Sequence, residues 1–320
     1  MPQPDREDIH LISQLTDWSA ASADQALETY VYQDKTTWRR FLPLFCLLLG
    51  VGLTVAGILF FFAYNWADLH KFAKLGLIEG LLTLLVLLVI GSKLSLTVKK
   101  TLLTGAGMLV GVLFAVFGQV YQTGADAYDL FLAWTLGITL WVFIIHFAPM
   151  WLLYILLCNI TMTLYGQQVS SNWSGLWYFT LLFLLDALFI VIALLIGWKK
   201  PSLRLPDWSI LVVALGAATL ATLGGIMAIY DPFRSQELLI YLAVMIPTYT
   251  TGIWYGYRYK KFFYLAALPF SLIVLGTALL LKQSYDTGML FFIFLFVVAS
   301  VTGLVWWLIR IQRQLSHEKN

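Results

Sequence analysis

The sequence predicts an all-α polytopic transmembrane helical bundle of about ten spans, from composition, run length and charge distribution. Apolar residues make up 60% of the 320 residues and charged residues 12%, whereas soluble domains carry about 45–50% and about 25%. The mean hydropathy is +0.82. A helix needs roughly 20 apolar residues to cross a bilayer, and such runs recur from Phe41 onward. They far exceed the roughly ten residues of a barrel strand, so helices are expected.

Polar breaks between the apolar runs divide the chain into three regions. Residues 1–38 are expected to form a cytoplasmic helical segment, residues 39–310 the transmembrane domain, and residues 311–320 a cytoplasmic tail. The spans are expected near 41–64, 75–92, 102–121, 130–147, 149–165, 176–198, 209–229, 238–257, 262–281 and 288–310. The fourth and fifth spans meet at the short stretch "HFAPM", which is the weakest of these breaks.

Lysine and arginine are distributed unequally between alternate loops, which predicts an orientation. With the N-terminus inside, sixteen of them fall in cytoplasmic segments: Arg6, Lys35, Arg39, Arg40, Lys93, Lys99, Lys100, Lys199, Lys200, Arg204, Arg258, Lys260, Lys261, Arg310, Arg313 and Lys319. Four fall outside: Lys71, Lys74, Arg234 and Lys282. Because short cytoplasmic loops carry an excess of these residues, the N-terminus and the C-terminus are both expected to be cytoplasmic.

The polar N-terminal segment is expected to contain two short helices. Helical spacing and a capping-box arrangement indicate them, through Ile9, Ile12 and Leu15 and through Ser22 and Gln25. No apolar core precedes residue 41, so a cleavable signal peptide is not expected. Two readings stay open: a packing cap on the bundle, which is favoured, and a partner-binding element.

Two polar stretches share one pattern and indicate an internal repeat. Gln119-x-Tyr121-x-Thr123-Gly124 recurs as Gln283-x-Tyr285-x-Thr287-Gly288, and each copy ends a span on the outer side. The pattern pairs spans 1–4 with spans 7–10, in the same direction, as a candidate parallel repeat. The motif is then a helix-ending device, with Thr-Gly providing the cap and the turn. The first copy also carries acidic residues that capping does not require.

The stretches "FFAYNWADLHKFAK" and "FGQVYQTGADAYDLFLAW" resemble the bacterial multi-pass membrane family catalogued as domain of unknown function 2157 (DUF2157). The resemblance covers mainly residues 1–150 and includes the short helical preamble. It implies a bacterial inner-membrane protein and carries no assigned activity. The matching positions are Asn65, Trp66, Gln119, Tyr121, Thr123, Gly124, Asp126 and Leu130.

Two acids fall well within spans and are functional candidates, because ionisable groups at membrane depth are costly. Asp186 lies close to the middle of the sixth span, and Glu79 lies nearer the outer end of the second. Removed from water, either carboxyl is a candidate proton- or cation-binding group. The alternative is structural, with a hydrogen bond from the acid holding two helices together.

Polar, acidic and aromatic residues gather at the outer ends of the first four spans, which predicts a binding pocket open to the periplasm. Such a pocket favours a cation or an amine- or hydroxyl-bearing solute. The alternative is an interfacial belt of amphipathic rings at headgroup level. The candidate substrate-binding residues are Asn65, Trp66, Glu79, Gln119, Tyr121, Thr123, Asp126 and Asp129, and Asp68 lies in the same region.

Several signatures of known chemistry are absent from the sequence. The four histidines have no metal-ligand spacing, and no hydrolase elbow, zinc-protease motif, phosphate-binding loop or dinucleotide fingerprint occurs. Cys46 and Cys158 both fall in apolar runs, where a thiol usually serves as a small apolar side chain. We therefore expect no cofactor, no metal and no nucleic acid.

Three functions remain open from the sequence. A transporter or permease-like protein for a small solute is favoured, with Asp186 or Glu79 as the proton or cation site. A non-catalytic scaffold or accessory subunit that holds a membrane-protein partner in the envelope is the second. An intramembrane enzyme acting on lipid-linked substrates is the least favoured, with Asp126, Asp129 and Glu79 as its acid/base set. Membrane lipid is the one partner that all three require.

Overall fold

The structure is a computed structural model, and it describes residues 18–19, 22, 35–64, 69–170, 172–231, 234–283 and 287–317. These residues form ten long α-helices and one short 3-10 helix, without a strand among them. All ten helices are long and apolar enough to cross a membrane, so the predicted polytopic helical fold is confirmed. The helices expected within residues 1–38 lie largely outside the described residues.

The helix boundaries follow the predicted spans and extend past most of them. The helices are α3 (Lys35–Tyr64), α4 (Lys71–Gly91), α5 (Leu96–Tyr121), α6 (Ala127–Ile145), α7 (Ala148–Gln168), α8 (Gly175–Lys199), α9 (Asp207–Tyr230), α10 (Ser235–Arg258), α11 (Phe262–Gln283) and α12 (Thr287–His317). The 3-10 helix η2 (Pro201–Leu203) joins α8 to α9. The helix α12 continues past residue 310, where the cytoplasmic tail was expected to begin. The weak break at "HFAPM" is real, because α6 ends at Ile145 and His146 has a left-handed backbone with φ of 41°.

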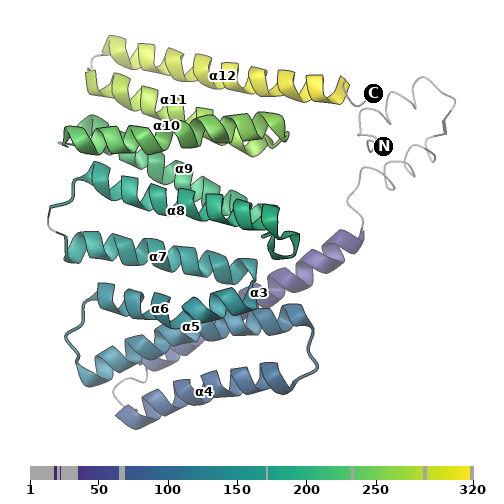
Figure 1. The fold of residues 1–320 in the computed structure, drawn as a ribbon, viewed down its shortest axis with the longest axis vertical. Coiled ribbons are helices and arrows are strands. Elements are labelled where there is room, and N and C mark those ends of the chain that lie inside the picture. Colours follow the sequence, from purple (N-terminus) through teal and green to yellow (C-terminus); the bar gives the residue numbers. More distant parts are fainter. Residues whose placement is uncertain are drawn as a thin grey trace.

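Consecutive helices run in alternating directions, so their connections fall on two opposite sides of the molecule (Figure 1). The helix α3 begins and α12 ends on the right of this view, and the connections α4–α5, α8–α9 and α10–α11 lie on the same side. These connections contain Lys93, Arg204 and Lys261. We call this the basic side. Residues 122–126 lie on the opposite side. The alternation agrees with the predicted topology, and the assignment of the basic side to the cytoplasm stays a prediction.

The helix packing repeats in the two ends of the chain. The helix α5 packs against α3, α4 and α6, and α11 packs against α9, α10 and α12. The helix α9 additionally touches α10. A parallel four-helix repeat predicts this correspondence of neighbours. Residues 284–286, which carry the centre of the second sequence motif, lie outside the described residues.

Small residues let the central helices approach one another closely. A Cβ on Gly111 of α5 would lie 2.4 Å from the Trp134 ring of α6, and one on Gly225 of α9 would lie 2.5 Å from Leu275 of α11. The Trp134 indole also donates a hydrogen bond to the Gly107 carbonyl oxygen at 2.8 Å. The glycines therefore act in packing, as is usual between membrane helices.

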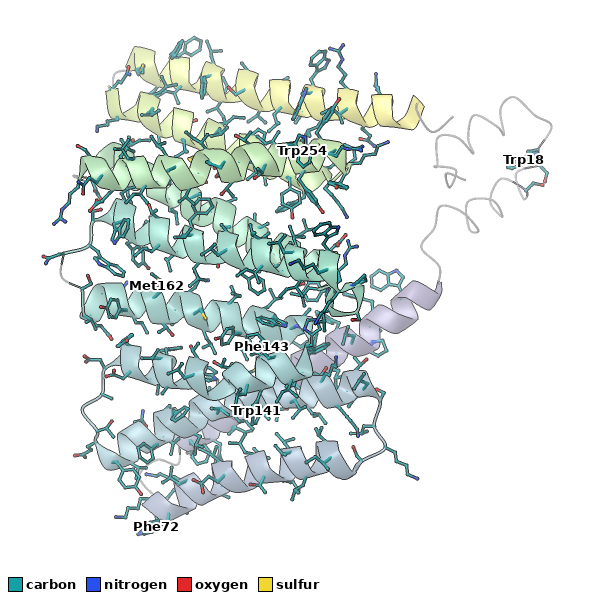
Figure 2. The ribbon with its side chains drawn as sticks, viewed as in Figure 1. Trp18, Phe72, Trp141, Phe143, Met162 and Trp254 are labelled. Atoms are coloured by element: carbon teal, nitrogen blue, oxygen red, sulfur yellow. The ribbon has the colours of Figure 1, made fainter. Side chains whose placement is uncertain are left out.

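Large apolar side chains also point away from the bundle. Phe72, Phe143 and Trp254, labelled in Figure 2, are between 61% and 64% exposed. In water, a surface with many such residues would favour association or aggregation. Around helices of this length it is the expected lipid-facing surface, since lipid chains are as apolar as these side chains.

Candidate functional site

An acidic pocket lies on the side opposite the basic side, where α4, α5 and α6 come together. Its volume is about 700 Å³. Five of the eight predicted substrate-binding residues line it: Glu79, Gln119, Thr123, Asp126 and Asp129. Glu79 comes from α4, Gln119 from the end of α5, and the other three from the following turn and the start of α6. Residues separated by up to fifty positions are thus brought to one cavity.

The turn between α5 and α6 is shaped by two left-handed residues. Gln122 follows α5 with φ of 46°, and Gly124 has φ of 66°. The Gly118 carbonyl oxygen accepts from the Gln122 amide and from the Thr123 amide at 3.3 Å. Thr-Gly was expected to provide the cap and the turn, but the C-cap residue is Gln122, which takes the first left-handed position. Gly124 supplies the second, which L side chains rarely adopt.

The start of α6 fixes the two aspartates of the pocket. Asp126 is the residue before the helix, and its amide donates to the Asp129 carboxylate at 3.0 Å. The same first turn is held to α7, since the Tyr128 amide donates to the Gln168 side-chain oxygen at 2.9 Å. Carboxylates at a helix N-terminus are favoured by the helix dipole. Both aspartates thus hold defined positions at the rim.

The electrostatic character of the pocket is strongly negative. Glu79, Asp126 and Asp129 contribute three carboxylates, and the described residues that line the pocket include no lysine, arginine or histidine. The remaining wall is largely apolar, with Phe114, Phe117 and other residues of α5. A cleft lined by one sign of charge with apolar walls concentrates oppositely charged ligands, and aromatic faces attract cations. The arrangement suits a small organic cation with an apolar part.

Among the described residues of the predicted site, Tyr121 does not line the pocket. Tyr121 is 49% exposed and packs its ring 4.7 Å from that of Phe117, which is typical of an interfacial aromatic residue. Asn65 and Trp66, together with Asp68, lie outside the described residues. The sequence did not single out Phe114 or Phe117, because an apolar residue facing a pocket has the same signal as one facing lipid.

Asp186 lies in a different part of the molecule. It sits on α8, is 3% exposed, and accepts a hydrogen bond from the Asn159 side-chain nitrogen of α7 at 2.8 Å. The helix α7 separates α8 from α6 in the packing order, and buried Ile138, Met150 and Leu157 fill the interface between α6 and α7. The acidic pocket therefore does not include Asp186.

The surroundings of Asp186 contain one buried polar atom without a hydrogen-bond partner in the described residues. This atom is the Asn159 side-chain oxygen. A Cβ on Gly216 of α9 would lie 3.4 Å from the Asp186 Oδ2 atom, so the absence of a side chain there admits the carboxyl between three helices. The described residues hold no group of three His, Cys, Asp or Glu side chains placed to bind a metal.

Ten apolar helices with lipid-facing surfaces and a polar pocket at one end define a polytopic α-helical membrane protein. Residues 18–151 match the model of the family described as "Predicted membrane protein (DUF2157)", which confirms the family resemblance over this part of the chain. The match covers α3 to α6 and therefore the whole acidic pocket. No curated protein and no solved structure matches the chain.

Proposed function

We propose that this protein is a permease-like membrane protein that captures a small organic cation in the acidic pocket between α4, α5 and α6. The observation that supports this most is the presence of three carboxylates in one 700 Å³ cavity whose described lining carries no basic side chain. All three carboxylates are exposed, so they can contact a cationic ligand directly and attract it together. We infer a bacterial inner membrane from the family resemblance, and a pocket that faces the periplasm from the distribution of lysine and arginine between the loops.

Movement of the solute across the membrane requires a second conformation. Buried residues at the α6–α7 interface separate the pocket from α8. Passage therefore needs α6 and α7 to move apart, as alternating-access transporters move one bundle against another. Asp186 and Asn159 lie beyond this core, where Asp186 is the candidate proton- or cation-binding group and Glu79 is the corresponding candidate in the pocket.

The first test measures binding to the full chain purified in detergent. Ethidium is the aromatic cation and fluorescein the aromatic anion, and fluorescence anisotropy reports binding of both. We expect saturable binding of ethidium and none of fluorescein. Glu79→Gln and Asp126→Asn should each weaken ethidium binding by about tenfold, equivalent to about 1.4 kcal/mol, because each removes one attractive charge.

Asp231→Asn is the matched control, since Asp231 is an exposed acid on the same side that does not line the pocket. Equal weakening by this control would mean that only the general surface charge matters. Binding of fluorescein as strong as that of ethidium would contradict the proposal. Uptake of ethidium into proteoliposomes then distinguishes transport from binding. Saturable binding without uptake would mean that the protein binds the cation as a receptor and does not transport it.

A further inference from the structure

Two cavities adjoin between α8–α9 and α10–α11, far from the acidic pocket. The first, of about 660 Å³, lies on the basic side and is lined by Arg204, Asp207 and Lys261. The second, of about 410 Å³, lies deeper in the bundle and has an almost entirely apolar lining that begins at Phe183. Both are lined by the same four residues: Leu194, Leu195, Tyr255 and Tyr264. The two cavities are therefore adjacent, and we call them together the amphipathic groove.

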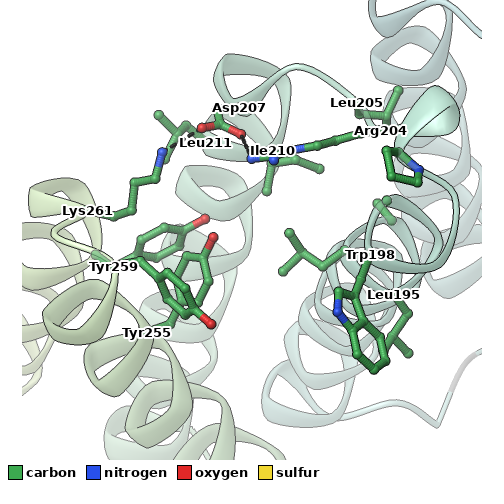
Figure 3. Close-up of a pocket in the computed structure, with 15 residues that line it drawn as sticks. Leu195, Trp198, Arg204, Leu205, Asp207, Ile210, Leu211, Tyr255, Tyr259 and Lys261 are labelled. Atoms are coloured by element: carbon green, nitrogen blue, oxygen red, sulfur yellow. Dashed lines mark hydrogen bonds and ion pairs between the residues drawn. The ribbon is translucent and has the colours of Figure 1, made fainter.

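The mouth of the groove is positively charged. Arg204 and Lys261 both bond the Asp207 carboxylate, at 3.0 and 2.5 Å, so two cations face one anion (Figure 3). A guanidinium has five N–H donors and an ammonium has three, and Asp207 accepts one from each. The Arg204 side chain is 63% exposed and that of Lys261 is 38% exposed, so both can reach a further anion.

The walls of the mouth are aromatic and lie at the expected depth of the lipid headgroups. Tyr255 and Tyr259 form one wall, with ring centroids 4.8 Å apart, and Trp198 and Leu195 lie across the cavity from them (Figure 3). Tyrosine and tryptophan are enriched where the hydrocarbon core meets water. We therefore expect the charged mouth to lie at the level of the phosphate groups.

The apolar part of the groove has the length of one lipid leaflet or more. It follows α8 from Leu195, where the two cavities share their lining, to Phe183, which is about 18 Å at 1.5 Å per residue. One leaflet contributes about 15 Å, half of a roughly 30 Å hydrocarbon core. Small residues of α9, Ala214 and Ala218, form part of the floor and leave room for a chain between the larger neighbours.

From these features we infer that the amphipathic groove binds one anionic phospholipid. Its phosphate accepts hydrogen bonds from the N–H groups of Arg204 and Lys261 that do not bond Asp207, and one acyl chain lies along α8 between α9 and α10. The net positive mouth selects an anionic headgroup over a zwitterionic one, and the apolar length excludes free phosphate as the natural occupant. This site is independent of cation capture, because it shares no residue with the acidic pocket.

Native mass spectrometry of the full chain in detergent tests the inference, with phosphatidylglycerol and phosphatidylcholine added in equal amounts. We expect one retained phosphatidylglycerol and at least fivefold less phosphatidylcholine. The double variant Arg204→Gln with Lys261→Gln should remove this preference. Its matched control is Lys93→Gln with Arg310→Gln, which removes the same charge from the basic side outside the groove and should keep the preference.

A second pair of variants tests the acyl-chain part of the groove. Val191 lines it and is 51% exposed, whereas Val212 is 53% exposed on α9 and does not line it. Val191→Trp should reduce retention of both lipids, and Val212→Trp should reduce neither. Each variant is first checked for a monodisperse elution profile and an unchanged melting temperature, so that Val191→Trp still decides the matter if the charge variant fails to fold.

Four results would overturn the inference. These are equal retention of the two lipids, equal loss of the preference in the Lys93/Arg310 control, unchanged lipid retention in Val191→Trp, and complete displacement of the lipid by inorganic phosphate. The last result would assign the basic mouth to a free anion. Ethidium binding is expected to be unchanged in the groove variants. A negative result for lipid binding therefore would not contradict the proposed cation capture, which the ethidium measurement tests separately.

Discussion

At the scale of the single residue, Asp186 illustrates how a buried acid is accommodated between membrane helices. Its carboxylate accepts from the Asn159 amide, which also donates to the Ile155 carbonyl oxygen at 3.0 Å. The small residue Gly216 faces it from α9. Such interhelical hydrogen bonds contribute about 1 kcal/mol in membranes. A structural role and a proton-binding role predict different responses to substitution.

The structural role predicts that Asp186→Asn is tolerated and that Asp186→Leu is not. In Asp186→Asn the new side-chain oxygen still accepts a hydrogen bond from Asn159. In Asp186→Leu the Asn159 nitrogen loses this acceptor, and the unfolding free energy is expected to fall by about 1 kcal/mol. Denaturation in detergent micelles, followed by circular dichroism, measures both variants. If Asp186→Asn leaves stability intact but abolishes pH-dependent ethidium uptake, the carboxyl is the proton site. Equal destabilisation by both variants would argue against the hydrogen-bond account.

At the scale of the element, the turn between α5 and α6 determines the shape of the acidic pocket. Its path requires the left-handed backbone of Gln122 and Gly124. The sequence predicted that a helix ends here, because Gly124 and the polar residues interrupt the apolar run. It did not predict which residues become left-handed, since glutamine at such a position is unusual and depends on the packing of both helices.

Gly124→Ala is predicted to lower stability by about 1 kcal/mol, the usual cost of placing an L residue in this conformation. No atom lies within 4 Å of a Cβ built there, so the cost comes from the backbone alone. Gly303→Ala in α12 is the matched control, because it also meets no atom within 4 Å and is helical. The control should leave the melting temperature unchanged or raise it, since alanine favours helices. A stable Gly124→Ala variant with unaltered ethidium binding would contradict this account of the turn.

At the scale of the whole molecule, the sequence was most informative where the lipid imposes a simple rule. All ten predicted spans overlap the candidate membrane spans of the structure, with ends that differ by at most six residues, because each must supply roughly 20 apolar residues. The polar part of the acidic pocket was also predicted, since acids such as Asp126 and Asp129 stand out in an apolar chain. The amphipathic groove was not, because its apolar residues look like any lipid-facing residue. Its basic mouth unites Arg204 and Lys261, which only the packing of α9 beside α11 brings together.

The sequence also did not predict that the acidic pocket and Asp186 are separate. The acidic pocket and Asp186 were both predicted from the cost of placing acids in a membrane. That cost does not indicate how far apart the two lie in the folded protein. The packing order from α6 through α7 to α8 keeps them apart. The account therefore depends on an acidic pocket that faces away from the basic side and is accessible to water without passing through the bundle.

Cysteine accessibility at Gln119 tests that claim most directly. Gln119 lines the pocket without contributing charge, and the native Cys46 and Cys158 are first replaced by serine and alanine. In intact cells, a membrane-impermeant maleimide should label Gln119→Cys from outside, ethidium should slow the labelling, and fluorescein should not. Lys93→Cys, on the basic side, should stay unlabelled until the membrane is opened. Labelling of Gln119→Cys only after the membrane is opened, or at a rate unaffected by ethidium, would contradict the account.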